Sequence, residues 1–327
     1  MDLPSKYGSR KLVKEPFQHQ QLLRDIWGEA WGVSNEVGQI KKALMHRPGT
    51  EVEQLHSGAS QIESGPVLLQ SIKGQSRQDR GTEKKPSLER LVSQWEGVRQ
   101  ALQHEGIDVV EQKDSRQPWP EQLYTRDLGM VIPGGVILSR LALYIRYGEI
   151  RATAETLGHL GVPILGAVQG TGFAEGGSFA MLDDRTAVIG RSERVNPAGI
   201  EQIRHILAIQ HIELLVVDLP ASIIHLDEAF MMVDYHKALV NTALLPYWFL
   251  DELKCRGIEM LHVDPQDPPL TINALAVAPG RVIMADSGKR TIDLLDRHGV
   301  SVIAVEADEI FKLGGGIHCM ILPLIRE

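Results

Sequence analysis

The chain has 327 residues, of which 43% are hydrophobic and 23% are charged, and its net charge is −8 at pH 7. This composition is typical of a globular protein with a sizeable core, and the acidic balance disfavours nucleic acid or an anionic membrane as a partner. The two cysteines, Cys255 and Cys319, are too few for a disulfide framework or a cysteine-based zinc site. Because no apolar run is long enough to cross a bilayer, we expect a cytoplasmic protein.

Two stretches near the N-terminus differ from the repeated pattern of the remaining chain. Residues 1–30 are predicted to form a helical appendage, with an amphipathic helix around Phe17 to Trp31 whose aromatic side chains pack on the body. Residues 56–86 are largely polar and long for a compact domain, which predicts a mobile insert that is either a lid or a disordered loop. The remainder, residues 31–327, is expected to form a single domain.

A helix followed by a short β-branched strand recurs five times along the chain. Each predicted helix ends at a residue suited to a left-handed cap: Gly106, Gly161, His211, Gly257 and Gly299. Strand-turn-strand pieces precede these helices, as in Met130 to Leu138, Phe179 to Ile189 and Ala274 to Met284. Five units of one type, none able to bury its apolar face alone, predict an α/β fold in which the units close radially around a shared centre.

Residues with acid and base chemistry stand where three of these units begin. His225 and Asp227 are two residues apart, so on a strand they would share one face, although the pair is equally consistent with a structural ion pair. Glu175 adjoins a Gly-Gly step at which the backbone can approach a ligand closely, and Asp127 follows an arginine. Taken separately, Glu175 and Asp127 each fit a solvated surface position.

The last cysteine follows three glycines and precedes an apolar run that closes the chain. This pattern predicts a tight turn that brings the Cys319 thiol to a buried element, where it is either a nucleophile or a small apolar residue. Cys255, in the tail of a predicted helix, is assigned to packing.

Equivalent positions of a radial array converge, so the starts of the units are expected to meet in one pocket. That pocket would hold Asp127, Glu175, His225, Asp227 and Cys319. One thiol, one imidazole and three carboxylates suit a planar cation, whereas the absence of a second cysteine or a histidine cluster argues against a metal site.

These motifs together resemble the guanidine-modifying superfamily, whose pentein fold is a five-bladed α/β-propeller and which includes arginine deiminases, dimethylarginine dimethylaminohydrolases and amidinotransferases. The resemblance rests on Gly314-Gly-Gly-Ile-His-Cys-Met, His225-Leu-Asp, Glu175-Gly-Gly, Thr125-Arg-Asp and Gly190-Arg-Ser-Glu-Arg194. It extends from Gly38 to Arg326, and the stretch from Gly38 to Gly49 resembles the first unit of these enzymes, of which the second strand is not apparent in the sequence. Residues 31–327 would then be one pentein catalytic domain.

The resemblance implies a role for each candidate residue. Asp127 and Asp227 would bind the guanidinium, whose fork of donors matches carboxylates. Cys319 would attack the guanidinium carbon and form a covalent amidino-thioether, and the cationic substrate would favour its thiolate. His225, oriented by Glu175, would protonate the departing amine and then activate water or an acceptor amine. No cofactor and no metal are implied.

The residues that would hold the rest of the substrate match those of arginine deiminases only in part. Arg146 and Arg194 resemble two arginines that hold the substrate carboxylate in arginine deiminases, but the position of a third is occupied by Gly314. Ser178 and Glu228 stand where the deiminases usually have aspartate and threonine. The expected partner is therefore a small cationic guanidino compound, either arginine or a derivative, and a homo-oligomer is left open.

Three functions are compatible with the sequence. The first is a hydrolase of a guanidino compound, and the second is an amidinotransferase that passes the same covalent intermediate to an amine. The third is a non-catalytic binder, because a ribosome anti-association factor shares the five-unit fold; that factor lacks the nucleophile set, so Cys319 with His225 argues against this function.

Overall fold

The computed structural model describes residues 19–55, 86–112 and 119–327. The predicted insert, apart from Pro86, and residues 1–18 of the predicted appendage lie outside the described residues. The predicted N-terminal helix is present as α2 (Gln20–Trp27) and is shorter than expected, because Gly28 at φ 86° ends it. Trp31 is buried in the body beneath the ammonium group of Lys42, as predicted, whereas Trp27 is 39% exposed and Phe17 lies outside the described residues.

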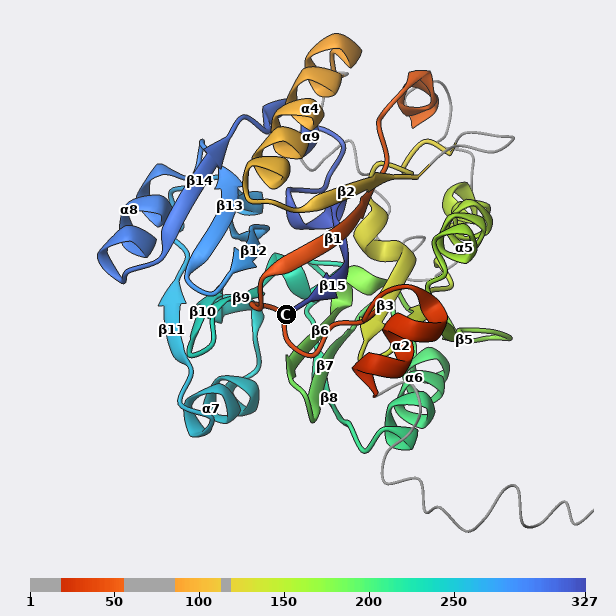
Figure 1. Ribbon diagram of the computed structural model, residues 1–327. Helices are drawn as coiled ribbons and strands as arrows, with labels where there is room; N and C mark the ends of the chain where they lie inside the picture. Colours follow the sequence, from red (N-terminus) through yellow and green to blue (C-terminus); the bar gives the residue numbers. More distant parts are fainter. Residues whose placement is uncertain (1–18, 56–85, 113–118) are drawn as a thin grey trace, which may run out of the picture.

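The described strands form five three-stranded sheets of one topology (Figure 1). In every sheet the central strand pairs antiparallel with one neighbour and parallel with the other. In pairing order they are β15 (Leu322–Arg326), β1 (Ile40–Met45) and β2 (Asp108–Glu111); β3 (Gly129–Ile132), β4 (Gly135–Leu138) and β5 (Ile164–Ala167); β6 (Phe179–Asp183), β7 (Thr186–Arg191) and β8 (Glu213–Asp218); β9 (Phe230–Asp234), β10 (Lys237–Val240) and β11 (Glu259–His262); β12 (Leu275–Ala278), β13 (Arg281–Ala285) and β14 (Ser301–Val305). The predicted strand-turn-strand pieces are confirmed.

Among the described residues, one α-helix lies between the central strand of each sheet and its parallel neighbour, and these helices lie toward the outside of the molecule in Figure 1. They are α4 (Leu88–His104), α5 (Glu149–Leu160), α6 (Pro197–Ile209), α7 (Tyr247–Cys255) and α8 (Lys289–Arg297); a short helix, α9 (Asp308–Phe311), follows β14. The predicted left-handed residues at the helix ends are confirmed, with φ between 58° at His211 and 81° at Gly161. Local sequence therefore fixes where each helix stops.

The strand that the first unit lacks is its first and not its second, because β1 is the central strand of the sheet. The place of the first strand is filled by β15 from the far end of the chain, which pairs antiparallel with β1 while β2 pairs parallel with it. In Figure 1 the C-terminus lies near the middle of the molecule, with the five sheets around it. Joining the two ends of the described chain in one sheet places the segment before β15 among the starts of the other units.

A short 3₁₀ turn precedes the first strand of every sheet. These turns are η5 (Thr125–Leu128), η7 (Gly176–Ser178), η8 (Leu226–Glu228), η10 (Pro269–Ile272) and η11 (His318–Met320). Other 3₁₀ turns are η2 (Thr50–Leu55), η6 (Tyr144–Arg146) and η9 (Thr242–Leu244). The expectation that His225 and Asp227 lie on a strand is wrong, because β9 begins only at Phe230 and the preceding segment forms the turn η8.

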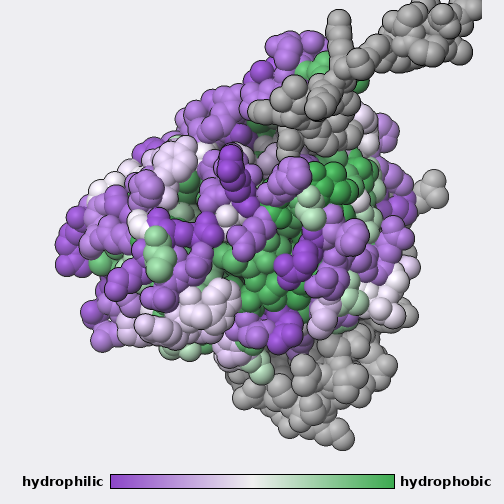
Figure 2. All heavy atoms as spheres, turned by 90° about the horizontal axis from the view of Figure 1, so that it is seen from below, coloured by the Kyte–Doolittle hydropathy of each residue, from purple (hydrophilic) through white to green (hydrophobic). Residues whose placement is uncertain are grey.

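The face seen in Figure 2, the side on which α6 and α7 lie in Figure 1, is mostly hydrophilic and has an apolar area near its middle. Exposed apolar side chains of these two helices include Ile209 and Trp248. Among the described residues, no helix has the length and apolar character that a membrane span requires. Cys255 is exposed at the end of α7, so its assignment to packing is wrong.

Candidate active site

The five turns before the first strands converge on one buried centre. Turn η5 contacts both η7 and η11, and η8 contacts both η7 and η10. Each turn carries or adjoins polar residues that are at least 93% buried: Asp127, Glu175, His225, Asp227, Asn273, His318 and Cys319. The structure thus brings together the five residues that the sequence places at the unit starts, and it adds Asn273 and His318, which the sequence analysis did not single out for the site.

His225 lies between two carboxylates from different sheets. Its Nε2 is 2.7 Å from Glu175 Oε2, and its Nδ1 is 3.5 Å from Asp127 Oδ1. Burial by itself lowers the pKa of His225, but the charges of Asp127 and Glu175 outweigh burial and raise this pKa to about 9. At neutral pH the imidazole is therefore protonated and can donate a proton.

Glu175 is fixed by groups on three sides. Its Oε1 accepts a hydrogen bond from the backbone N–H of Ala142 at 2.9 Å, and its Oε2 lies 3.4 Å from Nη1 of Arg194. Burial raises the pKa of Glu175, yet the charges of Arg194 and His225 outweigh burial and hold this pKa far below its ordinary value. Glu175 is thus an ionised carboxylate that orients the His225 ring.

The thiol of Cys319 faces Asp227. The Sγ atom lies 3.6 Å from Asp227 Oδ2, and Asp227 Oδ1 has no hydrogen-bond partner among the described residues. Burial raises the pKa of Cys319 well above its ordinary value, and the charges of Asp227 and Asp127 raise it further. Without a cation in the pocket the sulfur is therefore a thiol, and an entering cation would shift it toward the thiolate.

Replacing Asp227 with asparagine should lower the pKa of Cys319, because it removes a negative charge that disfavours the thiolate. The measurement is the pH dependence of alkylation by iodoacetamide in a Cys255→Ser background, so that Cys319 is the only cysteine. The midpoint should move to lower pH, while Asp251→Asn on the exposed face of α7 should leave it in place. A midpoint that stays or rises in Asp227→Asn would contradict this electrostatic assignment.

His318 and Asn273 hold the nucleophile turn. His318 Nδ1 is 2.8 Å from Asp227 Oδ2, and Asn273 Oδ1 accepts the backbone N–H of Cys319 at 3.2 Å. Burial and the positive charge of Arg126 lower the pKa of His318, so its ring is neutral at pH 7 and donates from Nδ1 to Asp227. His318 lies in the motif that contains Cys319, but its partner Asp227 is 91 residues away in the sequence. No local sequence pattern could therefore indicate this contact.

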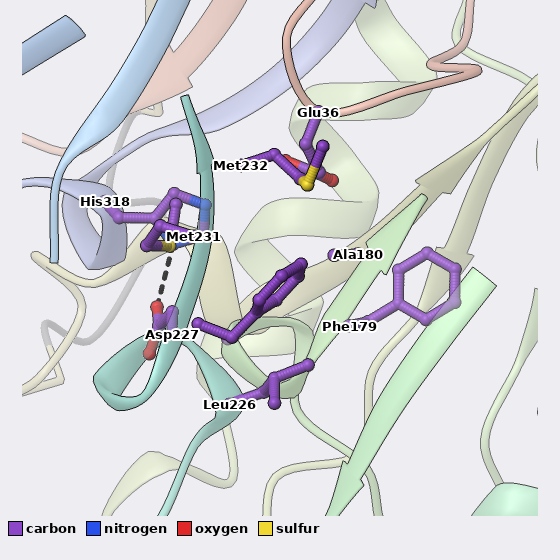
Figure 3. A pocket seen from close by; sticks show the side chains of 10 residues that line it. Glu36, Phe179, Ala180, Leu226, Asp227, Met231, Met232 and His318 are labelled. Carbon is purple, nitrogen blue, oxygen red and sulfur yellow. Dashed lines mark hydrogen bonds and ion pairs between the residues drawn. The ribbon is translucent and has the colours of Figure 1, made fainter. Parts of the chain in front are cut away.

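His318 and Asp227 also line a small pocket beside the site. Figure 3 shows their hydrogen bond at one side of this pocket, with Met231, Met232 and Leu226 among the apolar lining side chains. Glu36 lies there too and pairs with Arg126 at 3.1 Å. This pocket therefore combines apolar side chains with charged ones, and two of its buried polar atoms, Asp227 Oδ1 and His318 Nε2, have no hydrogen-bond partner among the described residues.

Glycines allow the turns to approach one another. A Cβ at Gly177 would lie 2.6 Å from Asp127 Oδ1 and 2.8 Å from His225 Nδ1, and a Cβ at Gly316 would lie 2.6 Å from Asn273 Oδ1. Gly314, the position at which arginine deiminases carry an arginine, has φ 88°, a backbone conformation that favours glycine. Gly314 is thus favoured by its backbone conformation and Gly316 by the close approach of Asn273, which agrees with the predicted tight turn.

Gly177→Ala should lower activity at least tenfold while the protein remains folded. The added methyl group would separate Asp127 from His225, and overpacking of this kind costs about 1–3 kcal/mol of stability. The measurements are kcat/KM and the denaturant midpoint. Gly158→Ala, whose Cβ meets nothing within 4 Å, is the matched control. Unchanged kcat/KM in Gly177→Ala would show that this close approach is not needed.

The two arginines predicted to hold a substrate carboxylate differ in their surroundings. Arg146 is buried against Asp127 and Glu149, with Nη1 2.6 Å from Asp127 Oδ2. Arg194 lies beside Glu175 and Glu193, and its Nε makes no hydrogen bond within the described part of the chain. That either arginine contacts the substrate stays a prediction.

Two residues, Glu228 and Ser178, differ from those that arginine deiminases usually have, and the structure explains only the first. Glu228 Oε1 accepts hydrogen bonds from the backbone N–H groups of Ile224 and His225 at 2.8 and 3.2 Å, so it caps η8 and holds the backbone of His225. Ser178 is fully buried, and its Oγ has no hydrogen-bond partner among the described residues. The glutamate is thus explained by local structure, whereas the structure shows no function for the serine hydroxyl.

Asp127, Glu175 and His225 offer ligand atoms within 4.8 Å of one another, close enough for a metal ion. However, both ring nitrogens of His225 face carboxylates, and a protonated imidazole has no lone pair to give a metal. At neutral pH this group therefore suits an organic cation that donates hydrogen bonds to carboxylates. Metal independence stays a prediction.

Known proteins resemble this chain in sequence and fold. An arginine deiminase of Limosilactobacillus reuteri is 22% identical over 401 residues, which cover 90% of this chain and 98% of that protein. A DDAH of Pseudomonas aeruginosa complexed with citrulline superposes with a TM-score of 0.70 at 20% identity, covering 88% of this chain and 100% of that one. The amidinotransferase SxtG of Microseira wollei superposes with a TM-score of 0.68 at 17% identity, covering 91% and 98%.

These similarities confirm that the chain resembles the guanidine-modifying superfamily with the pentein fold, as the sequence indicated. The model of the family described as N,N dimethylarginine dimethylhydrolase, eukaryotic, matches residues 71–326. The chain belongs to this family.

Proposed function

We propose that this protein is a cysteine-dependent hydrolase of a guanidino compound, arginine or one of its derivatives. The observation that supports this most is the arrangement of one buried thiol, one protonated imidazole and three carboxylates, at a site in a chain of this family. We further propose that residues 31–327 form one domain, in which the five sheets are the blades of an α/β-propeller, with residues 1–30 as an appendage.

The carboxylates would bind the guanidinium. Asp227 Oδ1 is buried without a hydrogen-bond partner among the described residues, which is costly until a donor arrives. Asp127 Oδ2 accepts one hydrogen bond, from Arg146 Nη1 at 2.6 Å, and has a further lone pair to offer. A guanidinium between these two aspartates would present its carbon to Cys319.

The reaction would then proceed in two halves. Binding of the guanidinium favours the thiolate of Cys319, and the thiol proton would leave to solvent because His225 is already protonated. The sulfur then forms a bond to the guanidinium carbon. The C–N bond breaks as His225 gives its proton to the departing amine, leaving an amidino-thioether. Neutral His225 next takes a proton from water, the water oxygen bonds to the same carbon, and the C–S bond breaks to release a urea-type product and the thiolate.

An amidinotransferase is the second candidate, because an amine could resolve the same thioether and an amidinotransferase shares the fold. One assay separates the two: purified protein is given arginine or a methylated arginine, with and without glycine, and the products are quantified. Hydrolysis predicts citrulline with ammonia or an alkylamine in either case. Ornithine and a guanidino product formed only with glycine would replace the hydrolase with a transferase.

The non-catalytic alternative has its own test. If the protein only binds a partner, Cys319→Ala should retain full biological activity, whereas the proposed hydrolase loses it. A cytoplasmic location and a homo-oligomer stay predictions.

A further inference from the structure

The peptide unit that precedes His225 is held at both of its ends. Its carbonyl, which belongs to Ile224, accepts a hydrogen bond from the hydroxyl of Ser192 at 2.5 Å. Its N–H, which belongs to His225, donates to Oε1 of Glu228 at 3.2 Å. Glu228 lies in η8 itself, whereas Ser192 follows β7 and is 32 residues from Ile224 in the sequence. Two separate parts of the chain therefore fix the orientation of this peptide.

The same hydroxyl also holds the backbone of Arg194. Ser192 Oγ accepts the N–H of Arg194 at 3.0 Å, and the backbones of Ser192 and Val195 exchange two hydrogen bonds of 3.2 Å, which close this turn. The side chain of Arg194 reaches Glu175 Oε2 at 3.4 Å, and the same oxygen lies 2.7 Å from Nε2 of His225. One serine thus connects the backbones of the two residues whose side chains meet at Glu175.

The place of the His225 ring depends on this peptide, because a rotation of the peptide would redirect the bond from Cα to Cβ. The ring has to keep Nε2 near Glu175 and Nδ1 near Asp127, so it has little freedom to move. Without the hydroxyl of Ser192, the carbonyl of the buried Ile224 would lose this hydrogen bond. A buried carbonyl that loses a donor is costly, which favours a rotated peptide.

We infer that Ser192 is a positioning residue, whose hydroxyl fixes the backbone of His225 so that the imidazole lies between Glu175 and Asp127. This inference rests on the proposed function, in which His225 is the general acid and base. The serine acts through His225 and takes no part in bond making or breaking. It gives a role to the serine of the motif from Gly190 to Arg194, which the proposed reaction does not use.

The protonation of His225 reports where its ring lies. Burial lowers the pKa of His225, and the neighbouring carboxylates outweigh burial and raise this pKa to about 9. The charged groups that face the ring are Asp127 on η5, Glu175 before η7, and Asp227 and Glu228 on η8. A ring displaced from Glu175 would remain buried but lose part of this attraction, so it would give up its proton at lower pH. A loss of stability alone would not move this midpoint.

The test titrates His225 by NMR in the full-length protein labelled with ¹⁵N-histidine, and His225→Gln assigns the signal. Ser192→Ala should move the midpoint to lower pH by about half a pH unit or more and should lower kcat roughly tenfold, with KM changed by less than about threefold. Ser192→Thr keeps a hydroxyl and should restore both the midpoint and kcat. Ser87→Ala is the matched control, because that hydroxyl caps α4 and its loss should lower only the stability.

A midpoint that stays in place in Ser192→Ala would overturn the inference, whatever happens to kcat. A shifted midpoint with parental kcat would also overturn it, because the position of the ring would then not matter for the reaction. If circular dichroism showed that Ser192→Ala does not fold, Ser192→Cys, which offers only a weak donor, would decide by the same two criteria. A parent that turns over no guanidino compound would instead refute the proposed function, and the titration, which needs no substrate, would still decide whether Ser192 positions His225.

Discussion

Replacing Cys319 with serine is expected to abolish turnover, with kcat reduced roughly 10⁴-fold or more, because covalent catalysis loses its nucleophile. Serine is nearly isosteric and leaves Asp127 and Asp227 in place, so substrate affinity should change by no more than a few fold. The measurements are product formation and calorimetric titration with the guanidino substrate.

The matched control is Cys255→Ser at the exposed end of α7, which should retain parental kcat. Mass spectrometry of the quenched parent should find the amidino adduct on Cys319 and none in the serine variant. Retained turnover in Cys319→Ser would exclude a covalent thioether, and loss of substrate binding in the same variant would place the thiol in recognition instead.

Replacing His225 with glutamine is expected to lower kcat by about 10²–10⁴, the usual contribution of a general acid and base. In the parent, kcat at saturating substrate should fall as pH rises through about 9, because the bound cation keeps Cys319 as the thiolate while the imidazolium that donates the proton is lost above the pKa of His225. The glutamine variant should lack this decline. The measurement is the pH profile of kcat for both proteins.

Glu175→Gln tests whether the neighbouring carboxylates raise the pKa of His225. Burial lowers the pKa of His225 and the two carboxylates raise it, so removing the negative charge of Glu175 should move the alkaline limb to lower pH. A limb that stayed near pH 9 in this variant, or that persisted in the glutamine variant of His225, would show that another group controls the profile.

Local patterns in the sequence were sufficient to predict the five units and the ends of their helices. Gly161 caps α5 in a left-handed conformation because glycine has no Cβ to clash there, and this preference is readable without tertiary contacts. The His225-Leu-Asp227 motif was misassigned to a strand, because alternation over three residues is equally compatible with the turn that Glu228 caps.

Tertiary contacts decided what surrounds the predicted residues. Arg146 could be recognised as a likeness to a carboxylate ligand, but its engagement with Asp127 depends on contacts across 19 residues and on burial that no local pattern encodes. Similarly, Asn273 supports the backbone of Cys319 from a turn 46 residues away. Neither residue type predicts such a role alone, since asparagine and arginine are common in solvated loops.

The sequence by itself determined that this protein repeats one strand-strand-helix-strand unit and that one thiol, one imidazole and several carboxylates stand at the unit starts. Backbone preferences and hydrophobic periodicity act over a few residues, so they can be recognised in the amino-acid sequence. Only the tertiary structure decided that β15 completes the first sheet and that His318 binds Asp227 beside the thiol. The same holds for the carboxylates that surround Arg146. These features arise from charge balance and hydrogen-bond satisfaction in a buried centre, which depend on residues brought together from distant parts of the chain.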